Sequence, residues 1–215
     1  MSDDKQLKQA VLDELNWEPS VNAAHIGVTA KAGVVTLMGH VEGYPEKFAA
    51  ENAARRVKNV KAVAEEIEVR LPFSGKRGDE EIAEAAVNSL KWDSAVPTDS
   101  VKAKVEKGWI TLTGEVDWHY QQEAAAIGVR GLRGVLGITN EITIKLRPNP
   151  VNIRDNIMVA LHRSWLDPET ITVTAQDGKV KLGGTVESWY GRDVASSTAW
   201  AAPGTTSVEN NITVT

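Results

Sequence analysis

A seven-residue segment with a glycine at each end occurs three times in this chain, and it constrains the fold more than any other feature. The copies occupy residues 33–39, 108–114 and 178–184, at spacings of 75 and 70 residues. Between the glycines, two large aliphatic residues alternate with a polar one, a period of two that is typical of a strand with one buried face. We therefore predict three copies of one small folding unit.

The first glycine of each copy is predicted to lie in a tight turn that opens the strand. Glycine suits a turn position of positive φ, because it has no Cβ to clash with the backbone. A phosphate-binding glycine loop would instead lead into the N-terminus of a helix. Gly33, Gly108 and Gly178 each precede a strand pattern, which favours the turn.

The patterns around each copy predict the element order helix, strand, strand, helix, strand. Apolar stripes at helical spacing begin at Leu7, Ile82 and Ile153. A three-stranded sheet with two helices on one face forms a two-layer sandwich. The predicted fold class is therefore α+β, with three tandem domains of this kind at residues 1–71, 79–146 and 149–215.

The composition narrows the classes of function. The formal net charge is −5, and acidic residues outnumber basic ones in each predicted domain, which argues against a nucleic-acid-binding surface. Cysteine is absent, so neither disulfides nor thiolate chemistry is possible. No nucleophile motif occurs, and the four histidines lack metal-ligand spacing. We predict a protein without catalytic residues or a metal centre.

A second recurring pattern covers the last predicted strand of the unit and the residues just before it. In the second unit Val135, Ile138, Asn140, Ile142 and Ile144 stand at fixed spacings. In the third unit Thr205 takes the first position, and residues 208–214 keep the rest. Together with the element order and the glycine-bounded strand, this ending resembles the BON domain, named for bacterial osmotic-shock and nodulation proteins. The first unit departs from the pattern, because Glu65 replaces the asparagine.

The resemblance implies a non-enzymatic bacterial stress protein. Several members of the family are associated with anionic phospholipid surfaces, and one cytoplasmic relative binds potassium. We therefore expect a protein that binds anionic phospholipid or an envelope-associated partner, and keep two alternatives: a potassium or small-ion sensor, and a scaffold that forms homo-oligomers. The N-terminus lacks the pattern of a signal peptide, so the expected location is the cytoplasm, or the periplasm if a leader was removed.

The candidate contact residues cluster around the second helix of each unit. Aromatic rings at a helix entrance can anchor at a lipid interface, and arginines near its end can meet anionic headgroups. The same residues could equally pack as a hydrophobic staple and balance the helix dipole. The candidates are Tyr44, Trp118, Tyr120, Arg130, Arg133, Trp189 and Tyr190.

Three further tryptophans stand at defined places in the pattern. Trp109 has the parity of the sheet face away from the helices, so we add it to the candidates as a contact between units. Trp17 and Trp92 coincide at the end of the first helix in two units, and we expect them to be structural.

Overall fold

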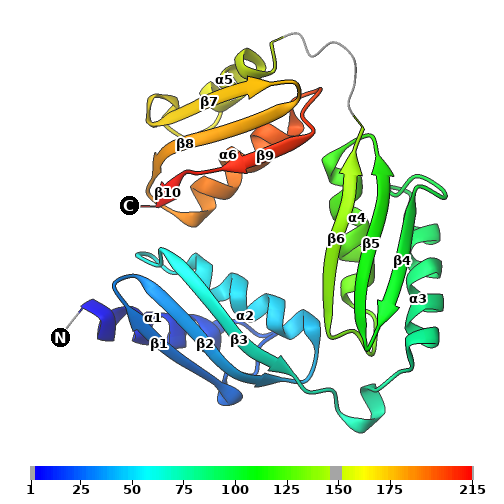
Figure 1. Ribbon diagram of the computed structural model, residues 1–215. Coiled ribbons are helices and arrows are strands. Elements are labelled where there is room, and N and C mark those ends of the chain that lie inside the picture. Colours follow the sequence, from blue (N-terminus) through cyan, green and yellow to red (C-terminus); the bar gives the residue numbers. More distant parts are fainter. Residues whose placement is uncertain (1–2, 146–151, 215) are drawn as a thin grey trace. The chain divides into compact units, whose positions relative to one another are not determined.

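The computed structural model describes residues 3–145 and 152–214 (Figure 1). The chain separates into two compact units, Met1–Thr143 and Ile144–Thr215, the first with two repeats and the second with one. Every repeat has the order helix, strand, strand, helix, strand, which confirms the predicted α+β class and the three tandem sandwiches. The predicted start of the third domain at Asn149 lies outside the described residues.

The helices and strands of the three repeats have the following bounds. The first repeat consists of α1 (Asp3–Trp17), β1 (Ile26–Lys31), β2 (Val34–Val41), α2 (Tyr44–Arg56) and β3 (Ala62–Val69). The second consists of α3 (Asp79–Trp92), β4 (Val101–Glu106), β5 (Trp109–Val116), α4 (His119–Arg130) and β6 (Gly137–Ile144). The third consists of α5 (Ile153–His162), β7 (Ile171–Gln176), β8 (Lys179–Val186), α6 (Trp189–Ala201), β9 (Ser207–Asn210) and β10 (Thr213–Val214).

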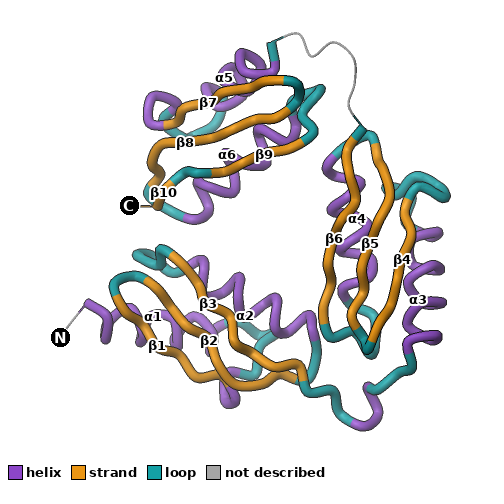
Figure 2. The backbone as a smooth tube through the Cα atoms, in the orientation of Figure 1, coloured by secondary structure: helices purple, strands orange, loops and turns teal. Residues whose placement is uncertain are grey.

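The glycine-bounded segment forms the middle strand of each sheet. In the first repeat β2 pairs antiparallel with β1 and parallel with β3, and α2 makes the crossover between the parallel strands. In the third repeat the last strand is interrupted, and its two parts, β9 and β10, both pair parallel with β8. Both helices of a repeat cover the same face of its sheet (Figure 2).

The alternating aliphatic residues of the middle strands form the core, as predicted. Val35 and Leu37 are fully buried, and their counterparts in the other two repeats are equally inaccessible. The second helices approach this layer through small residues, for example Ala50 and Ala53 in α2. The run Ser196-Ser197-Thr198, unfavourable for a helix, is accommodated in α6 because the Ser197 and Thr198 hydroxyls donate to the Val194 carbonyl.

Glycine is needed at the two ends of each segment for different structural reasons. Gly33, Gly108 and Gly178 have φ of 85°, 77° and 79° in two-residue hairpin turns, which confirms the predicted positive φ. The second glycine packs against another backbone: a Cβ at Gly39 would collide with the carbonyl oxygen of His25, and one at Gly114 with that of Ser100. Only glycine therefore suits both ends of the segment.

None of the helices in residues 3–145 and 152–214 combines the length and the apolar character needed to cross a bilayer.

Candidate functional site

The aromatic residues at the second-helix entrances occupy two structurally distinct positions. Tyr120 and Tyr190 are equivalent second residues of α4 and α6, and they are exposed to 59% and 67%. Tyr44 and Trp189 are equivalent first residues, and both are only partly exposed, as is Trp118 at the N-cap of α4. The aromatic residues that recur in the sequence therefore fall into two groups: two exposed tyrosines, and three rings that are partly buried.

In the third repeat, the entrance of α6 carries an aromatic pair that sequence reasoning missed. Trp165, in the loop after α5, stacks on Tyr190 with ring centroids 5.9 Å apart and planes at 4°. The Arg192 guanidinium lies over the Trp189 ring, 5.0 Å from its centroid. Trp165 has no aromatic counterpart in the other repeats, so the repeat pattern could not reveal it.

The two candidate arginines of the second repeat have different surroundings. The Arg130 guanidinium lies 3.6 Å from the centroid of the Phe48 ring of α2, a cation–π contact within the first compact unit. Arg133 is exposed beyond the end of α4. Ile127, two turns after Tyr120 on α4, is exposed to 59% and is a further apolar residue outside the predicted candidates.

Trp109 lies on the sheet face away from the helices, as its parity predicted. Its indole Nε1 donates to Thr139 Oγ1 at 2.8 Å, and its ring lies against the Cα of Gly137 on the neighbouring strand. The ring therefore covers a glycine of its own sheet, a contact that needs no second unit.

Trp17 and Trp92 differ from expectation. They end α1 and α3 and are exposed to 82% and 90%, so the prediction that they are structural was wrong. The apolar stripes of both helices are completed before these positions, by Leu15 and Leu90, and the chain turns away without covering the rings.

A side-chain clamp ties the second helix to the last strand in every repeat. In the second repeat Gln122 Nε2 donates to the Ile142 carbonyl at 2.6 Å, and Asn140 Nδ2 donates to the Gln122 carbonyl at 3.1 Å. Asn140 Oδ1 also accepts the Ile142 N–H at 3.2 Å. The third repeat uses Arg192 and Asn210 at the equivalent positions.

The first repeat makes the same clamp with charged groups. Glu65 stands at the asparagine position, and its Oε1 accepts the Ile67 N–H at 2.6 Å. Its other oxygen pairs with Lys47 Nζ at 2.8 Å, and the same ammonium donates to the Ile67 carbonyl at 2.7 Å. Glu65 therefore keeps the bond to the strand N–H, and its ion pair with Lys47 replaces the bond that Asn140 donates to the helix carbonyl.

One titratable group at a helix entrance has a perturbed pKa. Burial lowers the pKa of His119, the first residue of α4, and the Glu123 carboxylate, 3.7 Å from Nε2, raises it to a lesser extent. Across residues 3–145 and 152–214, histidines and carboxylates form no group of three or more that could hold a metal ion.

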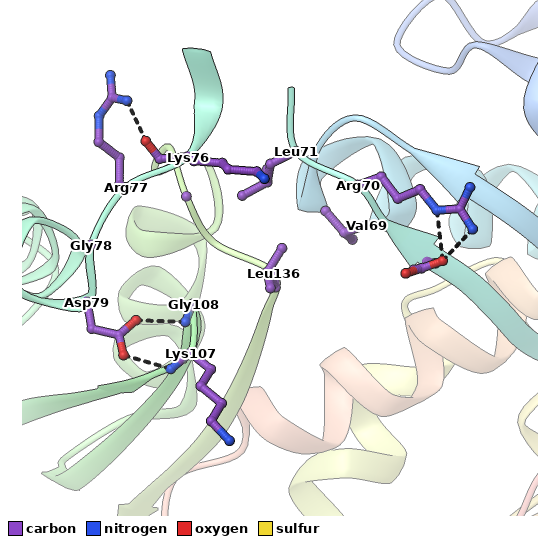
Figure 3. Close-up of a pocket in the computed structure, with 12 residues that line it drawn as sticks. Val69, Arg70, Leu71, Lys76, Arg77, Gly78, Asp79, Lys107, Gly108 and Leu136 are labelled. Atoms are coloured by element: carbon purple, nitrogen blue, oxygen red, sulfur yellow. Dashed lines mark hydrogen bonds and ion pairs between the residues drawn. The ribbon is translucent and has the colours of Figure 1, made fainter. Parts of the chain in front are cut away.

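A cleft of about 510 Å³ lies where the first linker meets the second repeat. We call it the linker cleft; its walls are residues 68–71, 76–79, 107, 108, 134 and 136. Figure 3 shows Asp79 facing the turn between β4 and β5, where its carboxylate accepts the N–H groups of Lys107 and Gly108 at 2.7 and 2.8 Å. The cleft is outside the sites that the sequence predicted.

Comparison with known families places the chain. The model of the BON domain matches residues 3–70, 78–145 and 150–215, so the chain belongs to the BON domain family. It is similar to the osmotically-inducible protein Y of Escherichia coli (strain K12), with 33% identity over 109 residues. That match covers 51% of this chain and 47% of the relative, so the chain spans about half the length of the curated relative it matches.

Among solved structures, two matches are to CdsD, a structural protein of the type III secretion system of Chlamydia trachomatis. One covers 96% of this chain and 91% of the other at 15% identity and a TM-score of 0.26. The second, to the C-terminal domain of CdsD, covers 99% of each chain at 15% identity and a TM-score of 0.27.

Proposed function

We propose that this BON domain chain is a non-enzymatic stress-response protein that binds anionic phospholipid surfaces through the entrances of its second helices. The observation that carries the proposal is the pair of equivalent, outward-facing tyrosines, Tyr120 and Tyr190. A tyrosine ring has an apolar body and a polar tip, which suits the boundary between acyl chains and headgroups. The osmotic induction named for the Escherichia coli relative supports a role in stress.

The second repeat has the more complete surface of the two. Ile127 is exposed on α4 seven residues after Tyr120, a spacing that places the two on one side of a helix. Arg133 follows the helix and supplies an exposed cation for a headgroup. Arg130 contributes less in this proposal, because its guanidinium is occupied by the Phe48 ring.

The test is sedimentation with phosphatidylglycerol and phosphatidylcholine vesicles at low and physiological salt. We expect selective binding to phosphatidylglycerol that weakens with salt, because the cationic contribution is screened. The double variant Tyr120→Ser/Tyr190→Ser should bind roughly tenfold more weakly or worse, since a buried aromatic ring contributes about 1.5–3 kcal/mol.

The matched control is Phe73→Ser, which removes an exposed ring from the linker without touching a second helix. It should bind vesicles like the parent chain. Equal binding to both lipids, or an equal loss in the control and the tyrosine variant, would reject the lipid surface. Attention would then move to a protein partner, to potassium or to self-association.

A further inference from the structure

The linker cleft has an unbalanced set of charges. Four of its residues are cationic, Arg70, Lys76, Arg77 and Lys107, and two are acidic, Glu68 and Asp79. Arg70 is neutralised by Glu68, whose carboxylate lies 2.7 Å from its guanidinium. Asp79 uses its two oxygens on backbone N–H groups. Three cations therefore remain against the single charge of Asp79.

No carboxylate pairs with these three cations in the part of the chain that the structure describes. The Arg77 guanidinium donates only to carbonyl oxygens, those of Ser74 and Lys76. The ammonium groups of Lys76 and Lys107 have no hydrogen-bond or ion-pair partner among the described residues. This local excess of positive charge stands in a chain of net charge −5.

The excess charge is specific to this place. The equivalent hairpin turns of the other repeats carry Ala32 and Asp177 where the second repeat carries Lys107. Lys76 and Arg77 belong to the linker, outside the acidic repeats. Repetition of the fold alone therefore does not account for the cations of the cleft.

The backbone segments that carry the charged side chains of the cleft are held in place by hydrogen bonds and packing. Asp79 anchors the turn that presents Lys107. A Cβ at Gly134 would stand 2.8 Å from the Cβ of Arg77, so glycine lets the linker pack closely against the second repeat there. In Figure 3 the cationic side chains leave the walls in different directions. Lysine stems are flexible, so Lys76 and Lys107 can turn toward a ligand without backbone movement.

We propose that the linker cleft binds a small phosphate-bearing anion. Its volume lies within the range of small-molecule sites, about 300–1,000 Å³. A phosphate or diphosphate group carries several charges and several acceptor oxygens, which matches three cations without a carboxylate partner better than a single carboxylate does. Val69, Leu71 and Leu136 supply apolar wall for the rest of such a molecule.

The test uses pyrophosphate as the probe, titrated into the full chain by calorimetry and followed by amide NMR shifts. We expect saturable binding with the largest shifts at Gly78, Gly108 and Leu136. The variant Lys76→Ala/Lys107→Ala should lose affinity by about tenfold or more, because it removes two charge-assisted contacts. Both side chains are exposed, so the variant should fold normally.

The charge-matched control is Lys8→Ala/Lys31→Ala, two exposed lysines of the first repeat. It should bind pyrophosphate like the parent chain. The proposal is overturned if no saturable binding occurs, or if both double variants lose affinity equally, which would indicate general attraction to positive charge.

Phosphatidylglycerol vesicles distinguish the source of the phosphate. If pyrophosphate displaces the chain from vesicles and Lys76→Ala/Lys107→Ala weakens both interactions, the ligand of the cleft is a lipid headgroup. If pyrophosphate binds the chain, but neither pyrophosphate nor the double lysine substitution changes binding to vesicles, the ligand is a soluble phosphate compound. In the second outcome, the proposed lipid surface is tested separately, by the variant Tyr120→Ser/Tyr190→Ser.

Discussion

The first and second repeats fold alike but tie the second helix to the last strand by different chemistry. The second repeat uses two neutral amides, Gln122 and Asn140, and the first uses the ion pair Lys47–Glu65. In both, an oxygen on the strand accepts the N–H two residues further on, and a donor on the helix reaches the carbonyl of that same residue. The comparison shows that this pattern of donors and acceptors recurs with different residue types.

The difference has consequences for stability. Side chains of the ion pair are 24% and 20% exposed, so much of their hydration is lost on folding, and their attraction must offset that cost. An amide pair has a smaller desolvation cost and is unaffected by screening. The first repeat should therefore be the more sensitive of the two to salt.

The largest effect should come from removing the amide of the second repeat with Asn140→Leu. Leucine can neither accept the Ile142 N–H nor donate to the Gln122 carbonyl, which leaves partly buried groups unpaired. We expect the second repeat to lose about 2 kcal/mol of stability. Native-state hydrogen exchange of β6 amides measures it, because it reports on each repeat separately. Asn88→Leu, on the exposed side of α3, is the control and should leave this exchange unchanged.

A smaller effect is expected from Glu65→Asn in the first repeat, which leaves Lys47 without its acid. We expect a loss of about 1 kcal/mol, reduced because water still reaches the ammonium. Adding Lys47→Gln installs the amide pair of the second repeat without changing the net charge. The double variant should recover to within about 0.5 kcal/mol of the parent and lose its dependence on salt. Additive losses, with no recovery, would show that the two clamps are not interchangeable.

The smallest effect concerns pH and the first residue of the second helix. His119 has a depressed pKa in the folded protein, so the unfolded chain binds more protons once the pH falls below the ordinary value of 6.5. The second repeat should therefore lose stability as the pH drops from 7 through that value, and the loss should level off below the folded pKa.

His119→Tyr, which installs the residue found at Tyr44 in the first repeat, should remove this dependence on pH. Urea unfolding monitored by β6 amide exchange between neutral and mildly acidic pH is the measurement. A parent chain whose second repeat is equally stable across this range would contradict the assignment.

Much of the fold was predictable because its signals are local. The alternation of Val35 and Leu37 with Thr36 specified the buried face, and Gly33 specified a turn of positive φ. Each signal involves residues a few positions apart, whose geometry follows from strand and turn stereochemistry.

The candidate sites were less predictable because exposure depends on what the rest of the chain covers. Equivalent sequence positions suggested a structural role for Trp17 and Trp92, yet nothing in their own repeats covers them. Trp165 joins Tyr190 only because a loop after α5 returns to the start of α6. Such contacts link residues far apart in the chain, and no local pattern encodes them.

The sequence by itself determined the number of units, their order of elements and the residues of the core, because periodicity and glycine stereochemistry act over short distances. Only the tertiary structure decided that the repeated segment is the middle strand, that Glu65 replaces an asparagine by pairing with Lys47, and that Lys76, Arg77 and Lys107 line one cleft. Those outcomes depend on which distant side chains meet, and folding brings them together through the burial of the core.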